Sequence, residues 1–139
     1  MLTNLEILNI VFTDTVAGVT SMTASIGNQS VPVQSIAGWI IWMKRVGTAF
    51  NWTLPWASYQ NGFGSIGDSN YWLGLERLYQ LTNSSKYRLR IEMKDRTTQK
   101  WISAEYWSFS IGDNTTKYQL RINGYVMLFI TFDISVGDI

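Results

Sequence analysis

Residues 87–94 constrain the fold more than any other segment, because apolar and charged residues alternate along them without a break. The apolar positions are Tyr87, Leu89, Ile91 and Met93, and the charged positions are Arg88, Arg90, Glu92 and Lys94. Alternation with a period of two predicts a half-buried antiparallel strand, with one face on a core and the other toward solvent.

Two more strands are expected after this segment. Turn-forming residues occupy 95–99, and the aromatic-rich segment 101–111 predicts the next strand. The apolar positions Tyr118, Leu120 and Ile122 mark a third. Because short links join these strands, the sequence predicts an antiparallel meander in this part of the protein.

An apolar run at 38–45 predicts a further strand upstream, since it is too short for an ordinary helix and is rich in strand-favouring residues. Its side chains should alternate, with Trp39 and Ile41 on one face and Ile40 and Trp42 on the other. This strand and the meander together indicate a central antiparallel sheet.

Two short helices are expected between these strands. Thr53 as a cap, Pro55 and a closing Gly62 bracket one or two helical turns, and Trp56 and Tyr59 should share a face. The second helix is expected at Leu75–Leu81, with a stripe made of Leu75, Leu78 and Leu81. The predicted fold class is therefore α+β, in one domain that spans residues 1–139.

Composition excludes several functional classes. The 139-residue protein has a net charge of +1 and only 15% charged residues, which gives no field for binding nucleic acid. It contains no His and no Cys, so the usual neutral-pH base, thiolate nucleophile and preferred zinc ligands are missing. No apolar run approaches the roughly 20 residues of a membrane-spanning helix.

Four N-glycosylation sequons favour an extracellular protein. They begin at Asn28, Asn51, Asn83 and Asn114. The absence of Cys would by itself suggest a reducing compartment, so the two signals conflict. The apolar positions of the first 18 residues have no basic segment ahead of them and do not indicate a signal peptide, so a targeting sequence is expected to lie outside this sequence.

Taken in order, a series of short motifs resembles the fibrinogen carboxy-terminal domain family, including its ficolin, tachylectin and angiopoietin-like members. The positions that carry the resemblance are Trp39, Trp56, Tyr59, Gly62, Phe63, Gly64, Trp72, Leu73, Gly74, Glu76, Leu81, Thr82, Leu89, Arg90, Tyr106, Phe109, Gly124 and Tyr125. The match covers about residues 18–125, and 126–139 form a divergent tail. Most of these positions have structural explanations, as buried side chains or as glycines in tight backbone.

The resemblance implies a non-enzymatic, extracellular recognition module. It also implies a carboxy-terminal subdomain that holds calcium and a pocket for acetylated sugars, and that subdomain is expected to lie beyond Ile139. The cofactor expectation for this protein is therefore none, and the binding residues are unknown. Expected partners are an acetylated glycan or an extracellular protein.

Two departures from the family stand out. The family places a cysteine near Val33-Gln34-Ser35 that pairs with another near Ile7, and both are absent here. Without that link, typically worth about 2–4 kcal/mol, the amino-terminal part should be looser. The continuously apolar run 126–132 should form a strand buried on both faces, either as a remnant of a truncated domain or as a replacement for the family's returning strand.

Other interpretations remain open. The protein could be a structural or protein-interaction fragment, or an inert truncated product, without a ligand pocket. The cations Lys86, Arg88, Arg90, Lys94 and Arg96 form a solvated face on the favoured interpretation, and a basic patch on the alternative. Trp101, Tyr106 and Trp107 could form a stacking platform. Glu92, Asp95 and Glu105 could serve as paired acids, although strand-end carboxylates explain them equally well.

Overall fold

In a computed structural model of the protein, the described residues are 5–13, 20–26, 28–36, 39–45, 49–65, 70–95, 97–98 and 100–128. The strands are β1 (Leu5–Thr13), β2 (Thr20–Ile26), β3 (Gln29–Ile36), β4 (Trp39–Lys44), β5 (Tyr71–Trp72), β6 (Tyr87–Asp95), β7 (Trp101–Ile111) and β8 (Leu120–Leu128). The helices are α1 (Trp56–Asn61) and α2 (Leu75–Ser84), with a 3-10 turn η1 at Asn114–Thr116.

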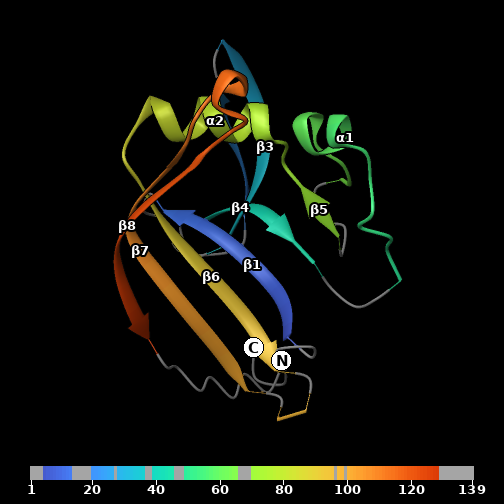
Figure 1. Ribbon diagram of the computed structural model, residues 1–139, viewed down its shortest axis with the longest axis vertical. Coiled ribbons are helices and arrows are strands. Elements are labelled where there is room, and N and C mark those ends of the chain that lie inside the picture. Colours follow the sequence, from blue (N-terminus) through green and yellow to red (C-terminus); the bar gives the residue numbers. More distant parts are fainter. Residues whose placement is uncertain are drawn as a thin grey trace.

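All of these strands belong to one antiparallel sheet, in the order β2-β3-β4-β1-β6-β7-β8, with β5 paired to β4. Figure 1 shows α1 and α2 together near one end of the sheet, while β1, β6 and β7 run away from them. The α+β class and the central antiparallel sheet with short helices are confirmed.

The meander β6-β7-β8 is confirmed, with one shifted boundary. The third strand begins at Leu120, not at Tyr118, because Lys117 and Tyr118 both adopt positive φ angles of 54° and 55°. That left-handed conformation cannot continue a strand. The strand then runs on through Leu128, so the first three residues of the apolar run belong to β8, and Val126 is half-buried. The remainder of that run lies outside the described residues.

The central strand β1 was not expected from the sequence. It pairs with β4 on one side and β6 on the other, and so joins the two halves of the sheet. Its register shifts between Ile7 and Asn9 against β6, and between Ile10 and Val11 against β4. Such irregularities break the period-two pattern, which explains why the segment does not alternate in the sequence.

The hairpin β2–β3 was also not anticipated, although Gly27-Asn28 is a dipeptide common in two-residue hairpins. Ser35 of β3 pairs with Ile40, whose partner on the other side is Phe12 of β1. Two strand spacings, about 10 Å, therefore separate β3 from β1, and Ile7 lies further along. This register does not bring Ser35 and Ile7 within reach of a disulfide.

The core lies between the helices and one face of the sheet. It contains Ile40 and Trp42 of β4, Leu78 and Leu81 of α2, and Leu89 with Phe109 of the meander. Ile40 and Trp42 thus share the core face as expected, and the α2 stripe is confirmed, with Leu75 packing at its margin.

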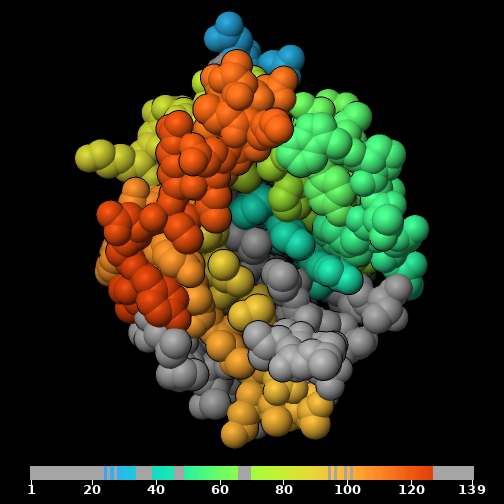
Figure 2. Space-filling model, in the orientation of Figure 1, coloured from blue at the N-terminus to red at the C-terminus, as the bar shows by residue number. Residues whose placement is uncertain are grey.

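Helix α1 differs from the expectation at its start. It begins at Trp56, with Pro55 as N-cap and no capping hydrogen bond from a side chain, so the capping role expected for Thr53 is wrong. Trp56 and Tyr59 contact different rings: Trp56 contacts Tyr118, whereas Tyr59 packs on Phe63 and Trp72. In Figure 2, α1 and η1 adjoin on the visible face, which agrees with a hydrogen bond from Gln60 Nε2 to Asn114 Oδ1.

Candidate functional site

An arginine lies against two tryptophan rings on the face of the sheet opposite the helices. The guanidinium of Arg88 in β6 lies 4.8 Å from the ring centre of Trp107 in β7 and 5.6 Å from that of Trp39 in β4. At these distances the ring faces attract the cation. Trp107 is nonetheless 57% exposed. The arrangement therefore orients a large aromatic side chain without burying it.

Gly124 of β8 supports the other side of Trp107. Its φ is +69°, and a Cβ at this position would lie 3.0 Å from Cβ of Trp107 and 3.1 Å from Cδ1. Only glycine combines this conformation with so close an approach. The Trp107 side chain is thus held between Arg88 and the β8 backbone. We call Trp39, Arg88, Trp107 and Gly124 the outer cluster.

Arg90 lies beside the outer cluster and pairs with two carboxylates. Its Nη2 is 2.8 Å from Glu92 Oε1, and its Nε is 3.7 Å from Glu105 Oε1. The guanidinium also lies 5.7 Å from the Trp39 ring centre. Among the described residues, Arg88 has no ion pair, although the charges of Arg88, Arg90, Glu92 and Glu105 together sum to zero. Lys86 is exposed, and the side chains of Lys94 and Arg96 lie outside the part of the protein that the structure describes.

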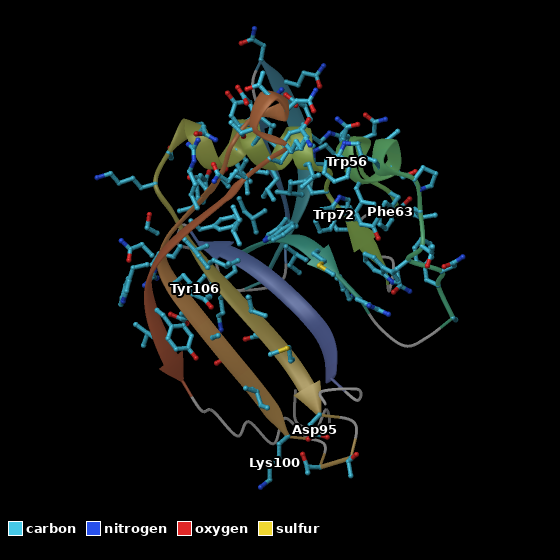
Figure 3. The ribbon with its side chains drawn as sticks, viewed as in Figure 1. Trp56, Phe63, Trp72, Asp95, Lys100 and Tyr106 are labelled. Carbon is cyan, nitrogen blue, oxygen red and sulfur yellow. The ribbon has the colours of Figure 1, made fainter. Side chains whose placement is uncertain are left out.

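The three candidate acids are occupied by structural contacts. Glu92 and Glu105 both pair with Arg90. The Oδ1 atom of Asp95 accepts hydrogen bonds from the backbone N–H groups of Thr98 and then Thr97, which lower the pKa of its carboxyl. Figure 3 shows Asp95 with Lys100 at the end of the β6–β7 hairpin, far from Trp56 and Trp72. Glu92, Asp95 and Glu105 therefore do not form an isolated pair of acids.

The family-motif aromatics gather on the helix side. Trp42 packs edge-on against Trp72, which also contacts Tyr59 and Phe63. The indole N–H of Trp72 donates to the carbonyl of Tyr59 at 2.8 Å. Figure 3 shows Phe63 and Trp72 side by side near α1. These rings stabilise the fold, whereas Trp39 lies on the outer face.

The motif glycines allow tight backbone packing in this region. A Cβ on Gly62 would lie 2.5 Å from the carbonyl oxygen of Leu73, and one on Gly64 would lie 2.4 Å from that of Asn70. A Cβ on Gly74 would lie 2.8 Å from the Asn61 backbone. All three also have positive φ. They hold the connection between α1, β5 and α2 in place.

Glu76 and Thr82 attach α2 to the end of the meander. The Tyr118 hydroxyl donates to Glu76 Oε2 at 2.9 Å, and the N–H of Ile111 donates to Thr82 Oγ1 at 3.2 Å. Burial raises the pKa of Tyr118, and the hydrogen bond to Glu76 adds to that effect. These two motif positions therefore have structural roles.

A row of exposed apolar residues lies along β8. Leu120, Ile122 and Tyr125 are exposed, and they pair in register with Ile111, Phe109 and Tyr106, so they point to the core side of the sheet. Tyr125 contacts Tyr106, with ring centres 5.3 Å apart. Of the platform expected from Trp101, Tyr106 and Trp107, the structure places Tyr106 and Trp107 on opposite faces, and the Trp101 side chain lies outside the described residues.

The four sequons differ in how their amides are used. All four asparagines are exposed. Asn51 Oδ1 accepts from the N–H of Thr53 at 2.9 Å, and Asn114 Oδ1 accepts from Gln60. By contrast, Asn83 Nδ2 donates to two carbonyl oxygens, those of Tyr79 at 2.9 Å and Ile111 at 2.8 Å.

No group of three or more His, Cys, Asp or Glu side chains that could hold a metal ion occurs among the described residues. A groove of about 420 Å³ is lined by Ile26, Asn28, Gln29 and Gln80. Within the described ranges, no helix is both long and apolar enough to cross a membrane.

Known proteins are similar to this protein in sequence. Mouse angiopoietin-related protein 1 is 40% identical over 88 residues, which cover 63% of this chain and 18% of that protein. Chicken tenascin-R is 35% identical over 119 residues, which cover 81% of this chain and 8% of that protein. The protein thus spans less than a fifth of the length of these relatives.

Solved structures of fibrinogen-like domains have a similar fold. The fibrinogen-like globe domain of human ANGPTL6 superimposes with a TM-score of 0.72 at 29% identity, covering 78% of this chain and 50% of that one. Lamprey fibrin D-dimer, solved with a bound peptide ligand, gives a TM-score of 0.69 at 27% identity, with coverages of 81% and 37%. The family model for the C-terminal globular domain of the fibrinogen beta and gamma chains matches residues 33–129, and the protein belongs to that family.

Proposed function

We propose that this protein is an extracellular, non-enzymatic recognition module that binds a protein partner through the outer cluster. One observation carries the proposal: Trp107 is largely exposed and yet held in one orientation by Arg88 and Gly124. Tryptophan and arginine are the residue types that most often dominate binding energy at protein interfaces. An ordered side chain also loses little entropy on binding.

The extracellular setting is supported by the relatives and by the sequons. Angiopoietin-related proteins and tenascins are extracellular proteins. The four asparagines of the sequons are exposed, as attachment of a glycan requires. The non-enzymatic assignment is supported by the candidate carboxylates, since Glu92 and Glu105 are paired with Arg90.

The outer cluster favours a partner that is apolar and acidic. The exposed indole of Trp107 offers apolar area, and Arg88, which has no ion pair among the described residues, offers a cation to a carboxylate. A protein segment with an acidic side chain beside an apolar one fits both. An acetylated sugar would use the indole face and accept hydrogen bonds from the guanidinium without neutralising its charge, whereas a carboxylate would also neutralise it, so the protein partner is favoured.

The test is binding of the purified protein to cultured animal cells, measured by flow cytometry. Trypsin treatment of the cells should remove binding, whereas enzymatic removal of cell-surface glycans should leave it. Substituting Trp107→Ala should reduce binding at least tenfold. Arg88→Gln should reduce it less, because the indole surface remains.

Trp56→Ala provides the matched control, since Trp56 is a similarly exposed tryptophan, at 54%, on helix α1 away from the outer cluster. It should leave binding unchanged. Binding that survives trypsin and disappears with the glycans would replace the protein partner by a carbohydrate. Equal losses in Trp56→Ala and Trp107→Ala would contradict the assignment of the surface.

A further inference from the structure

We propose that in the folded, secreted protein Asn28, Asn51 and Asn114 carry N-linked glycans, whereas Asn83 carries none, because a glycan on its amide would remove hydrogen bonds that the fold uses. The inference rests on the extracellular setting of the proposed function. All four sequons fit the same motif, and they differ in whether the asparagine amide nitrogen donates hydrogen bonds in the folded protein.

The amide of Asn83 has no free hydrogen. A carboxamide nitrogen has two hydrogens, and here one is directed to the carbonyl of Tyr79 and the other to the carbonyl of Ile111. Both contacts are to oxygen atoms, so they also fix which end of the amide is nitrogen. A glycan bond would replace one of these hydrogens and place a sugar where a carbonyl oxygen now lies within 2.9 Å.

These contacts hold the end of α2 to the end of β7. Thr82 accepts from the N–H of Ile111, and Asn83 donates to the carbonyl of the same residue. Two adjacent side chains therefore satisfy both backbone groups of a residue that is 4% exposed. A glycan on Asn83 would leave a buried carbonyl without its donor, which is costly.

The amide nitrogens of the other three sequons donate to no group among the described residues. Asn51 and Asn114 use the amide oxygen as an acceptor, so a glycan on the nitrogen preserves their hydrogen bonds. Asn28 lies in the exposed turn between β2 and β3. None of these positions loses a contact among the described residues when the nitrogen is substituted.

The experiment is secretion of the full-length protein from cultured animal cells behind an added signal peptide. Secreted protein is treated with peptide N-glycosidase in heavy-oxygen water, which marks each occupied asparagine as a labelled aspartate for mass spectrometry. We expect the label at Asn28, Asn51 and Asn114 and none at Asn83. An unlabelled asparagine among the three overturns the assignment of that position.

Two variants distinguish the effect of losing the Asn83 sequon from the effect of losing its hydrogen bonds. Ser85→Ala destroys the Asn83 sequon and keeps its amide, so it should change neither the glycan mass nor the melting temperature. Asn83→Gln should lower the melting temperature with no loss of glycan mass. A label at Asn83, or a loss of mass in Ser85→Ala, overturns the proposal. Because the signal peptide is supplied, these results do not depend on whether the natural protein is secreted. Natural secretion is tested separately, by fractionating cells that make the protein without the added signal peptide.

Discussion

The two faces of strands β6 and β7 use aromatic residues in opposite ways. On the core side, Phe109 is buried and stacks on Trp42, with ring centres 6.1 Å apart. On the outer side, Trp107 is held by Arg88 and remains exposed. A buried aromatic ring stabilises the fold, whereas an exposed ring remains available to contact a partner. On the function proposed above, the core face of these strands serves folding, whereas the exposed part of the outer face around Trp107 serves recognition.

The largest expected loss of stability follows from a substitution on the core side of the sheet. Phe109→Ala removes a ring that is 3% exposed, and should lower the free energy of unfolding by about 3–5 kcal/mol. Urea denaturation followed by tryptophan fluorescence would measure it. If the free energy of unfolding falls by less than about 1 kcal/mol, the core side can repack around the missing ring, and the two faces differ little in their contribution to stability.

A smaller effect is expected where α2 joins the meander. Thr82→Val keeps the shape of the side chain and removes the acceptor for the buried N–H of Ile111, so it should cost about 1–3 kcal/mol. Thr82→Ser keeps the hydroxyl and is the matched control. If valine and serine destabilise the protein equally in urea, the hydrogen bond is not the cause.

Regular segments of the fold could be predicted from the sequence, and irregular ones could not. Strands β4, β6 and β7 alternate or form short apolar runs, and α2 has a clear leucine stripe, so their residues indicate the correct elements. Strand β1 carries register shifts that remove the alternation. The start of β8 was misplaced because Tyr118 is apolar in the pattern, yet its backbone is left-handed.

The candidate site was predictable only in part. An aromatic platform that includes Trp107 is a natural hypothesis from the sequence, but the partner of Trp107 is Arg88, whose pattern favours a solvated charge. The two residues meet because β6 and β7 are neighbours in the sheet. The role of Gly124 depends on a close approach between strands, which spacing along the sequence does not encode.

A modest effect is expected on the outer side. Gly124→Ala imposes a methyl group on a left-handed backbone and crowds Trp107, so it should cost about 1–2 kcal/mol and reduce binding. Urea denaturation and the cell-binding assay give the two readouts. Unchanged binding in a folded Gly124→Ala protein would show that the orientation of Trp107 is not set by this glycine.

The smallest effect is expected at Asp113, which belongs to neither face. Hydrogen bonds from the Thr115 side chain and then the Thr116 backbone lower the pKa of its carboxyl below the ordinary value of 3.8. Its contribution to stability is therefore present above pH 3.8 and lost as the pH falls through the lowered pKa. Asp113→Asn should flatten this acid decline in melting temperature. An unchanged decline would assign it to other carboxyls.

The most direct test of the account is a paired measurement of stability and cell binding on Phe109→Ala and Trp107→Ala. Binding is expressed per folded molecule, using the folded fraction from denaturation. We expect Phe109→Ala to lose stability and keep binding, and Trp107→Ala to keep its stability within about 1 kcal/mol and lose binding. If both variants lose stability and binding together, the two faces do not have separate roles, and the account is contradicted.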